Sequence, residues 1–224
     1  NGEYFSLNEL LQKEKVKENS VDKNKFYLYN KNNTHMGYWK KERASMKRAL
    51  IVVDYQRDFV TGSLGFPGAV ALAERIAKKI AAYHKSGDVV LFTMDTHTDD
   101  YRNTQEGKHL PVPHCIKGTA GHTLVPEVAE QVEPQDLFFE KDTFGSTDLF
   151  VYLRTQQYAS IELVGVVSSI CVLSNAVLCK TALPEVPILV DSSCIAAPDP
   201  TLQEAAILMM KNLQMQILPE EETP

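Results

Sequence analysis

Short runs of apolar residues recur along the chain from residue 48 onward, and longer stretches with helical spacing separate them. The runs are only a few residues long and are rich in Val, Ile, Leu and Phe, which favours strands over helices. The pattern predicts six strands, at 48–54, 89–94, 137–140, 161–166, 188–190 and 215–217. Because the strands are apolar rather than alternating, we expect both faces of their sheet to be covered.

The stretches between these runs predict helices. The first, Ala69 to Lys85, places Leu72, Ile76, Ile80 and Tyr83 on one face, and Gly87 ends it. Further helices are predicted at 147–157, 170–182 and 201–212, and a long loop rich in Pro, Gly and His at 96–122. Alternating strands and helices predict an α/β fold, a Rossmann-like three-layer sandwich with a mostly parallel six-stranded sheet. Loops as long as 96–122 are usually functional or disordered.

The composition of the chain changes near Met46. Residues 1–45 are rich in Lys, Asn and Glu, and we interpret them as an N-terminal extension, whether tail, leader or fusion segment. Residues 46–224 form the predicted globular domain. The spacing of Leu7, Leu10 and Leu11 permits a short helix that docks on a partner, but the polarity of the segment favours a weakly ordered tail.

Composition and charge narrow the classes of partner. The 224 residues, 44% hydrophobic and 23% charged, suffice for one globular domain, and a net charge of −6 argues against nucleic acid or an anionic membrane as a partner. No apolar run approaches the roughly 20 residues of a membrane span, and no signal peptide is visible. The four cysteines are interpreted as reduced thiols of a cytoplasmic protein. The sequence is also compatible with a homo-oligomer.

Three strand-like runs end at or lead to a chemically reactive residue: Asp54, Lys141 and Cys171. Ends of parallel strands meet at one edge of a sheet, so we expect an acid, an ammonium and a thiol there. Cys171 falls in the first turn of a predicted helix, where the helix dipole and Lys141 would favour the thiolate and free N–H groups would hold an oxyanion. The alternative, a structural cysteine, fits Cys179 and Cys194 better. Taken alone, Asp54 could equally be a residue of a strand-to-loop turn, and Lys141 could equally be an ordinary surface lysine.

A second group of residues suits a divalent metal. Asp95 and His97 follow the second strand, and His114 lies further along the loop. Carboxylate and imidazole ligands fit Zn, Fe or Mn, and the sequence does not choose between them. The alternative is that these residues only make loop hydrogen bonds. His109 and His122 are interpreted as surface residues.

Residues 46–218 resemble the nicotinamidase/isochorismatase-like cysteine hydrolase superfamily in five stretches that occur in the expected order. The stretches are Asp54–Phe59 (D-x-Q-x-D-F), Asp95–His97, Pro113–Thr119 (P-H-C-x-x-G-T), Glu140–Lys141 and Gly165–Val172.

The resemblance implies specific roles for these residues. It implies a catalytic triad of Asp54, Lys141 and Cys171, and a metal held by Asp95, His97 and His114. It also implies a cis peptide at Val166–Val167, an oxyanion hole made by the N–H groups of Val167 and Cys171, and Glu106 as an additional candidate near the metal. Phe59 and Phe144 are candidate pocket aromatics. The implied reaction converts nicotinamide and water to nicotinate and ammonia through a thioester, as in NAD salvage.

The chain departs from the family pattern at three places. Thr98–Tyr101 replaces a run with a further His, Pro111 stands where an aromatic residue often does, and Ser168–Ser169 replaces Thr-Asp before the nucleophile. These departures concern the substrate more than the reaction. The metal set favours nicotinamidase over isochorismatase-type ether hydrolysis. Hydrolysis of another small amide stays open, as does a catalytically lapsed binding module that uses residues 1–45 as a partner contact.

Overall fold

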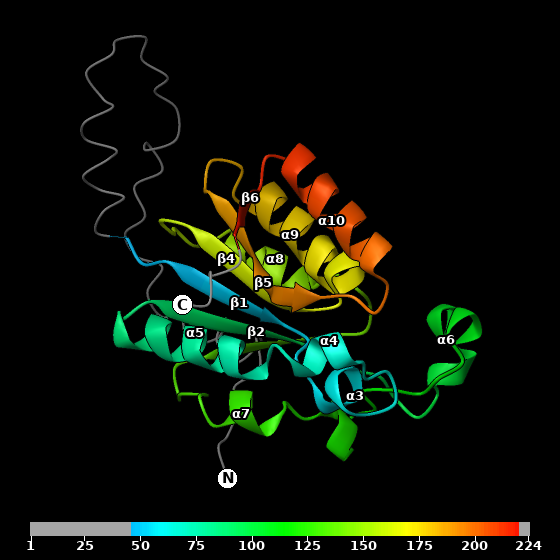
Figure 1. Ribbon diagram of the computed structural model, residues 1–224. Helices are drawn as coiled ribbons and strands as arrows, with labels where there is room; N and C mark the ends of the chain where they lie inside the picture. The colour runs from blue at the N-terminus through cyan, green and yellow to red at the C-terminus, as the bar shows by residue number, and fades with distance from the viewer. Residues whose placement is uncertain (1–45, 220–224) are drawn as a thin grey trace, which may run out of the picture. The chain divides into compact units, whose positions relative to one another are not determined.

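The computed structural model describes residues 46–219, and the predicted extension 1–45 lies outside them. The described residues contain one six-stranded sheet in the order β3-β2-β1-β4-β5-β6, with every neighbouring pair parallel (Figure 1). The strands, labelled as in Figure 1, are β1 Ala49–Val53, β2 Val89–Asp95, β3 Leu137–Lys141, β4 Ile161–Val166, β5 Ile188–Ala196 and β6 Gln216–Leu218. The predicted fold class is therefore confirmed, and the sheet is wholly parallel.

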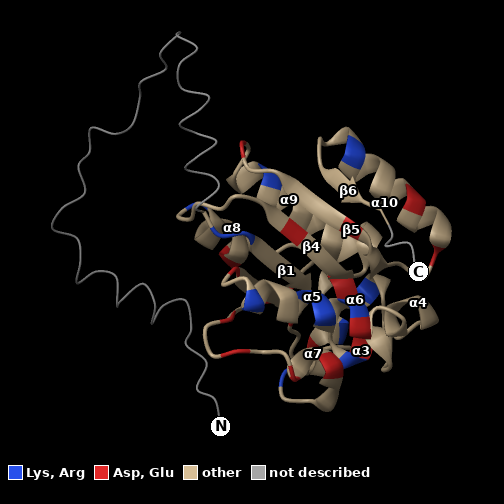
Figure 2. Ribbon diagram, turned by 60° about the vertical axis from the view of Figure 1, so that its left-hand side comes forward, with Lys and Arg blue, Asp and Glu red and all other residues tan. Residues whose placement is uncertain are grey.

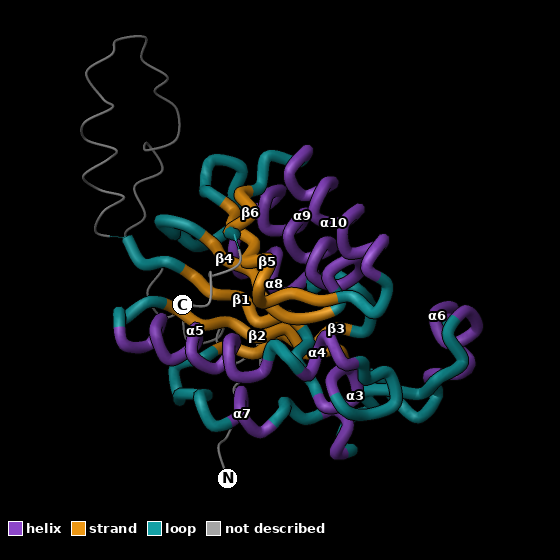
Figure 3. Tube along the Cα trace, viewed as in Figure 1, coloured by secondary structure: helices purple, strands orange, loops and turns teal. Residues whose placement is uncertain are grey.

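Helices cover both faces of the sheet, as Figure 3 shows. The helices are α3 Arg57–Val60, α4 Pro67–Val70, α5 Ala73–Lys85, α6 Gln105–His109, α7 Pro126–Ala129, α8 Thr147–Leu153, α9 Leu173–Ala182 and α10 Pro200–Asn212. Helices α5 and α7 pack on one face, and α8, α9 and α10 pack on the other. None of the helices within residues 46–219 is long and apolar enough to cross a membrane.

The central strand β1 divides the core in two. All five of its side chains are buried. Leu50 and Val52 join the cluster that includes the buried residues of α5, whereas Ile51 and Val53 join the cluster of α8, α9 and α10. Successive side chains of a strand point to opposite faces, so an uninterrupted apolar run is what a strand between two helical layers requires.

The order of the strands reverses between β1 and β4. The chain proceeds outward from β1 to β3, then returns to place β4 on the other side of β1. Ligands in open parallel sheets bind at the carboxyl ends of the strands beside such a reversal. Close approach of the two strands depends on Gly165, which has a φ of +116° and whose Cβ would lie 2.1 Å from the carbonyl oxygen of Val53.

Three of the helices have boundaries that differ from the prediction. The single helix expected at 69–85 is two helices, because the chain turns at Ala71 so that Leu72 and Ala73 both enter the core. The helix expected at 147–157 ends at Leu153. The helix expected at 170–182 begins only at Leu173, and residues 168–172 form a π-helical turn before it. The expected loop at 96–122 contains α6 and two short 3-10 turns, Tyr101–Asn103 and Ala120–His122.

Candidate active site

The ammonium group of Lys141 lies at the centre of a buried polar group at the carboxyl edge of the sheet. Its Nζ is 2.7 Å from Asp54 Oδ2, 3.1 Å from Asp95 Oδ1 and 3.8 Å from Cys171 Sγ. All four residues are buried. The structure thus brings together the acid, ammonium and thiol that the sequence placed at three separate strand ends.

Strand register sets these positions. Asp95 and Lys141 are the last residues of β2 and β3 and pair directly with one another. Asp54 follows β1 with a φ of +46°, a left-handed conformation that Asp adopts more readily than most residues. Its other oxygen, Oδ1, accepts a 2.7 Å hydrogen bond from the hydroxyl of Thr93 in the neighbouring strand. The carboxylate of Asp54 is therefore held by a strand on one side and by an ammonium on the other.

Burial and charge shift the pKa values of this group. Burial raises the pKa of Asp54 above its usual range, although Lys141 opposes the rise. For Lys141, burial alone would lower the pKa, but the charge of Asp54 outweighs it and holds the pKa well above its ordinary value. Lys141 is therefore a permanent cation, and Asp54 is a stronger base than an exposed aspartate.

The expectation that the helix N-terminus and Lys141 would lower the pKa of the Cys171 thiol is not met. Burial raises the pKa of the Cys171 thiol well above its ordinary value, and the charge of Asp54 adds to the rise, while Lys141 opposes it. The physical reason is that desolvation of a fully buried sulfur exceeds the stabilisation that one nearby cation supplies. Burial therefore favours the thiol form of Cys171 over the thiolate.

The turn that carries Cys171 is fixed by Asn175. The side-chain amide of this buried residue donates to the carbonyl oxygens of Cys171 at 2.8 Å and Phe144 at 3.1 Å, and its oxygen accepts from the N–H of Ser146 at 3.0 Å. The turn follows a cis peptide between Val166 and Val167. Asn175 thus joins the thiol-bearing turn to the segment that follows β3.

The three residues expected to bind metal also lie together. Ligand atoms of Asp95, His97 and His114 all lie within 4.8 Å of one another, and all three residues are buried. Asp95 Oδ2 is 3.0 Å from His97 Nε2 and 3.3 Å from His114 Nε2. Although burial opposes it, contacts with the two histidines and the charge of Lys141 hold the pKa of Asp95 below its usual value.

The surroundings of the histidines fit a metal. His97 Nε2 is buried and, although it lies 3.0 Å from Asp95 Oδ2, it makes no well-aligned hydrogen bond. His114 Nδ1 is 2.8 Å from the carbonyl oxygen of Val112, which leaves its Nε2 for a ligand. The ring of Tyr101 packs against both imidazoles, with centroids 4.7 Å from His97 and 4.9 Å from His114. One carboxylate and two oriented imidazoles suit a divalent cation.

Glu106, on α6, lies near the same cluster. Its Oε1 is 3.8 Å from His97 Nε2 and 3.7 Å from His114 Nε2. Burial raises the pKa of Glu106, and the charge of Asp95 adds to the rise. The structure therefore places the additional candidate beside the three expected ligands.

The other expected residues fall in different settings. Phe59 is buried, with its ring centroid 5.3 Å from that of His114, whereas Phe144 is 45% exposed. His109 is exposed as expected. His122 is half-buried rather than on the surface, because its Nε2 is 2.9 Å from the hydroxyl of Thr96.

Gln56, within the Asp54–Phe59 stretch, supports the backbone of Asp95. Its side-chain nitrogen donates to the carbonyl oxygen of Asp95, and its side-chain oxygen accepts from the N–H of Asp95, both at 2.8 Å. In the same motif, Asp58 accepts from the N–H of Cys115 at 2.8 Å and so holds the loop next to His114. The available signal for Gln56 was its place two residues after Asp54, at the carboxyl end of the first strand. No local sequence pattern indicated that Thr93, Tyr101 or Asn175 would support the site.

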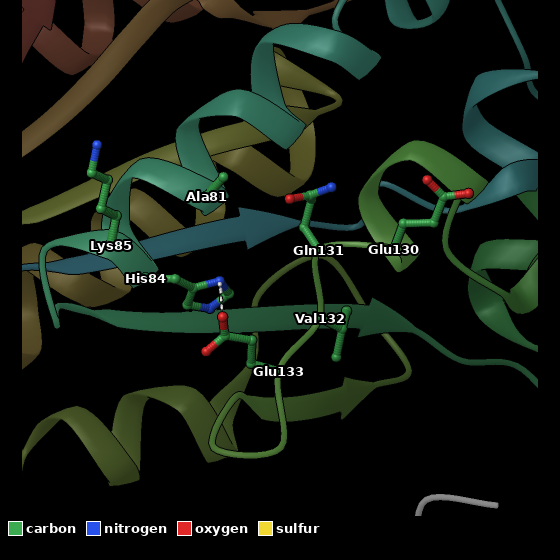
Figure 4. Close-up of a pocket in the computed structure, with 7 residues that line it drawn as sticks. All are labelled: Ala81, His84, Lys85, Glu130, Gln131, Val132 and Glu133. Atoms are coloured by element: carbon green, nitrogen blue, oxygen red, sulfur yellow. Dashed lines mark ion pairs between the residues drawn. The ribbon is translucent and has the colours of Figure 1, made fainter.

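A surface depression elsewhere on the molecule plays no part in this group. His84, Lys85 and Glu133 are among its lining residues (Figure 4). The crossover helix α5 runs back from the carboxyl end of β1 to the start of β2, so its last residues, His84 and Lys85, lie at the opposite edge of the sheet. The depression is therefore remote from Cys171.

Comparisons with known proteins agree with the geometry. The family model described as "Isochorismatase domain" matches residues 48–222. The isochorismatase family protein PncA of Bacillus subtilis is 35% identical over 144 residues, 59% of this chain and 78% of the relative. The nicotinamidase/pyrazinamidase of Mycobacterium tuberculosis is 32% identical over 146 residues, 58% of this chain and 76% of the relative. The crystal structure of Bacillus subtilis nicotinamidase/pyrazinamidase PncA superposes with a TM-score of 0.69 and 29% identity, covering 78% of this chain and all of the other.

Proposed function

The chain belongs to the isochorismatase domain family and is a hydrolase of amide C–N bonds, and within the family we propose that it is a metal-assisted, nicotinamidase-like cysteine amidohydrolase. One observation carries the proposal. A buried lysine lies between a basic carboxylate and a thiol, and it shares a second carboxylate with a candidate metal cluster. Nicotinamidases are among the relatives that the chain resembles over most of their length.

The thiol is activated by proton transfer. In the proposed reaction, Asp54 takes the proton of Cys171, which its raised pKa equips it to do. Lys141 stabilises the thiolate as it forms. The sulfur then attacks the amide carbonyl, and the N–H groups of Val167 and Cys171 stabilise the oxyanion.

The rest of the cycle returns the proton. The C–N bond breaks, and protonated Asp54 gives its proton to the leaving nitrogen, so ammonia departs and a thioester remains. Asp54 then accepts a proton from a water molecule that attacks the thioester. The C–S bond breaks, the carboxylic acid leaves, and protonated Asp54 returns its proton to the Cys171 sulfur. The same carboxylate thus acts as base and then as acid in each half of the reaction.

Asp95, His97 and His114 would hold the divalent metal. When bound, a metal there supplies a Lewis acid that fixes the orientation of a substrate ring nitrogen or an ordered water. Glu106, on α6, lies 3.7–3.8 Å from both histidines and would face the same cation. Elemental analysis of the purified protein distinguishes Zn, Fe and Mn.

The proposed substrate is a pyridine carboxamide, and nicotinamide hydrolysis would place the enzyme in NAD salvage. Phe59, packed on His114, supplies an aromatic face near the metal cluster. Pro111 supplies none, and loss of an aromatic stack costs about 0.5–1.5 kcal/mol. Such a loss lowers kcat/KM by roughly three- to tenfold and does not abolish it.

Steady-state ammonia release from nicotinamide, pyrazinamide and simple aliphatic amides tests the assignment. We expect kcat/KM to be highest for a pyridine or pyrazine carboxamide. Equal values for nicotinamide and aliphatic amides would leave only a broader amidohydrolase. No release from any amide by the metal-loaded protein would favour a lapsed binding module.

Residues 46–224 are proposed to carry the whole reaction, because every proposed site residue lies after Met46. A chain that begins at Met46 should fold and keep the kcat/KM of the full chain on the best amide. A large loss of rate with the fold intact would show that residues 1–45 contribute to the site.

A further inference from the structure

Helix α10 exposes an unusual amount of apolar surface. Leu208 is 67% exposed, Leu202 53% and Met209 50%, and Leu213, at the end of the helix, is 37% exposed. The neighbouring helix α9 adds Val177, also exposed. Proteins that remain monomeric rarely expose contiguous apolar patches of large side chains.

Helix α5, of the same length on the other face of the sheet, provides an internal comparison. Its sequence, AERIAKKIAAYHK, contains six charged or His side chains, and none of its large apolar side chains is exposed. The sequence of α10, PTLQEAAILMMKN, contains only two charged residues, Glu204 and Lys211 (Figure 2). Both helices bury one face against the sheet, so they differ in the side chains that they expose to solvent.

The two charges of α10 lie in a regular arrangement. Glu204 and Lys211 are seven residues apart, which puts them nearly in line along the helix and about 10 Å apart. Leu202 and Met209 have the same spacing and form a second line on the other side of Leu208. Neither charged side chain makes an ion pair within residues 46–219.

From this pattern we propose that α10 docks antiparallel against α10 of a second copy of this chain, forming a two-fold symmetric dimer. A two-fold axis midway between residues 207 and 208 places Leu202 opposite Leu213 of the second copy. The same axis places Glu204 of each copy opposite Lys211 of the other, so this pair of opposite charges forms twice. Symmetry therefore makes the patch complementary to itself in both apolar contact and charge. Leu208 lies near the axis, and the small Ala205 permits close approach of the helices.

Sedimentation velocity of the full chain over a range of concentrations tests the dimer. We expect wild type to dimerise and Leu208→Glu to be monomeric, because it places two carboxylates beside the axis. Glu204→Lys or Lys211→Glu alone should raise the dimer Kd by about tenfold or more, because each puts like charges opposite one another. The double variant Glu204→Lys/Lys211→Glu should return the Kd close to that of wild type.

Lys78→Glu, an exposed charge reversal on α5, is the matched control and should leave the Kd unchanged. The proposal is overturned if wild type is monomeric throughout, if no α10 variant changes the association, or if the double variant is no better than the single ones. A second measurement does not depend on destabilising the dimer. Leu208→Cys should form a disulfide-linked dimer on mild oxidation faster than Lys78→Cys, and equal rates would contradict the proposed axis.

Discussion

Asp95 and Lys141 connect the two halves of the site. One oxygen of Asp95, Oδ1, accepts from Lys141 Nζ at 3.1 Å, while the other, Oδ2, faces the two histidines. The ammonium that faces the thiol and the cluster that suits a metal therefore share a single carboxylate. We therefore expect a substitution in one half of the site to affect the other half.

Removal of the lysine charge should affect both catalysis and stability. Lys141→Met leaves Asp54 and Asp95 buried without their common cation, which should cost about 3–5 kcal/mol of unfolding free energy. Ammonia release should fall by roughly a hundredfold or more in the variant that remains folded. Lys117→Met, which breaks only an exposed pair with Glu140, is the control and should change neither quantity appreciably. Near-normal activity of Lys141→Met would remove the lysine from the mechanism.

The reactivity of Cys171 should be limited by its proton. Limited labelling with iodoacetamide, located by mass spectrometry, should modify Cys171 before Cys115 and abolish hydrolysis. The labelling rate should rise with pH, because burial raises the pKa of the thiol. Asp54→Asn removes the proposed base, so hydrolysis should be lost while Cys171 can still be labelled at high pH. Labelling of Cys115 first, with activity retained, contradicts the assignment.

The acid limb of the pH profile should report Asp54. The reaction needs the ionised carboxylate, and burial raises its pKa, so kcat/KM should begin to fall, as pH decreases, at a value above the ordinary Asp pKa of about 3.9. The hydrogen bond from Thr93 stabilises the charged form. Thr93→Val should therefore move the acid limb to higher pH, whereas Thr181→Val, on the exposed side of α9, should not. An unmoved limb would mean that another group controls it.

The metal should depend on the clustered histidines. Purified wild type should contain close to one equivalent of a divalent metal by elemental analysis, and His97→Ala should lose most of it. His109→Ala, an exposed histidine on the same loop, should keep it. Full occupancy in His97→Ala would show that the ligands are assigned wrongly. Dialysis against a chelator should lower ammonia release, and addition of the metal should restore it.

Asn175 should act as a positioning residue. Asn175→Ala removes two donors and one acceptor that join the Cys171 turn to residues 144–146, which should cost about 1–3 kcal/mol of unfolding free energy. Activity should fall mainly through kcat, because the thiol is misplaced while the metal ligands are untouched. Metal content, measured in parallel, should stay normal. A change in metal content without a change in kcat would point to a different role.

Much of the fold could be read from the sequence because its signals are local. An apolar run such as Ala49–Val53 identifies a buried strand by itself, and alternation with helical stretches implies parallel strands with their ends at one edge. The positions of Asp54, Lys141 and Cys171 at or just after those ends followed from the same reasoning. The break of the first predicted helix at Ala71 did not, because its cause is the packing of Leu72 and Ala73 against the core.

The tertiary structure alone decided how the site residues act on one another. Which oxygen of Asp95 meets Lys141, and which meets the histidines, depends on strand register and side-chain conformation. The sequence suggested a thiolate at Cys171, whereas the fold buries the sulfur and raises its pKa, because desolvation depends on every neighbouring atom rather than on the adjacent residues. The sequence by itself determined which chemical groups meet, and the packing around them determined their protonation and their partners.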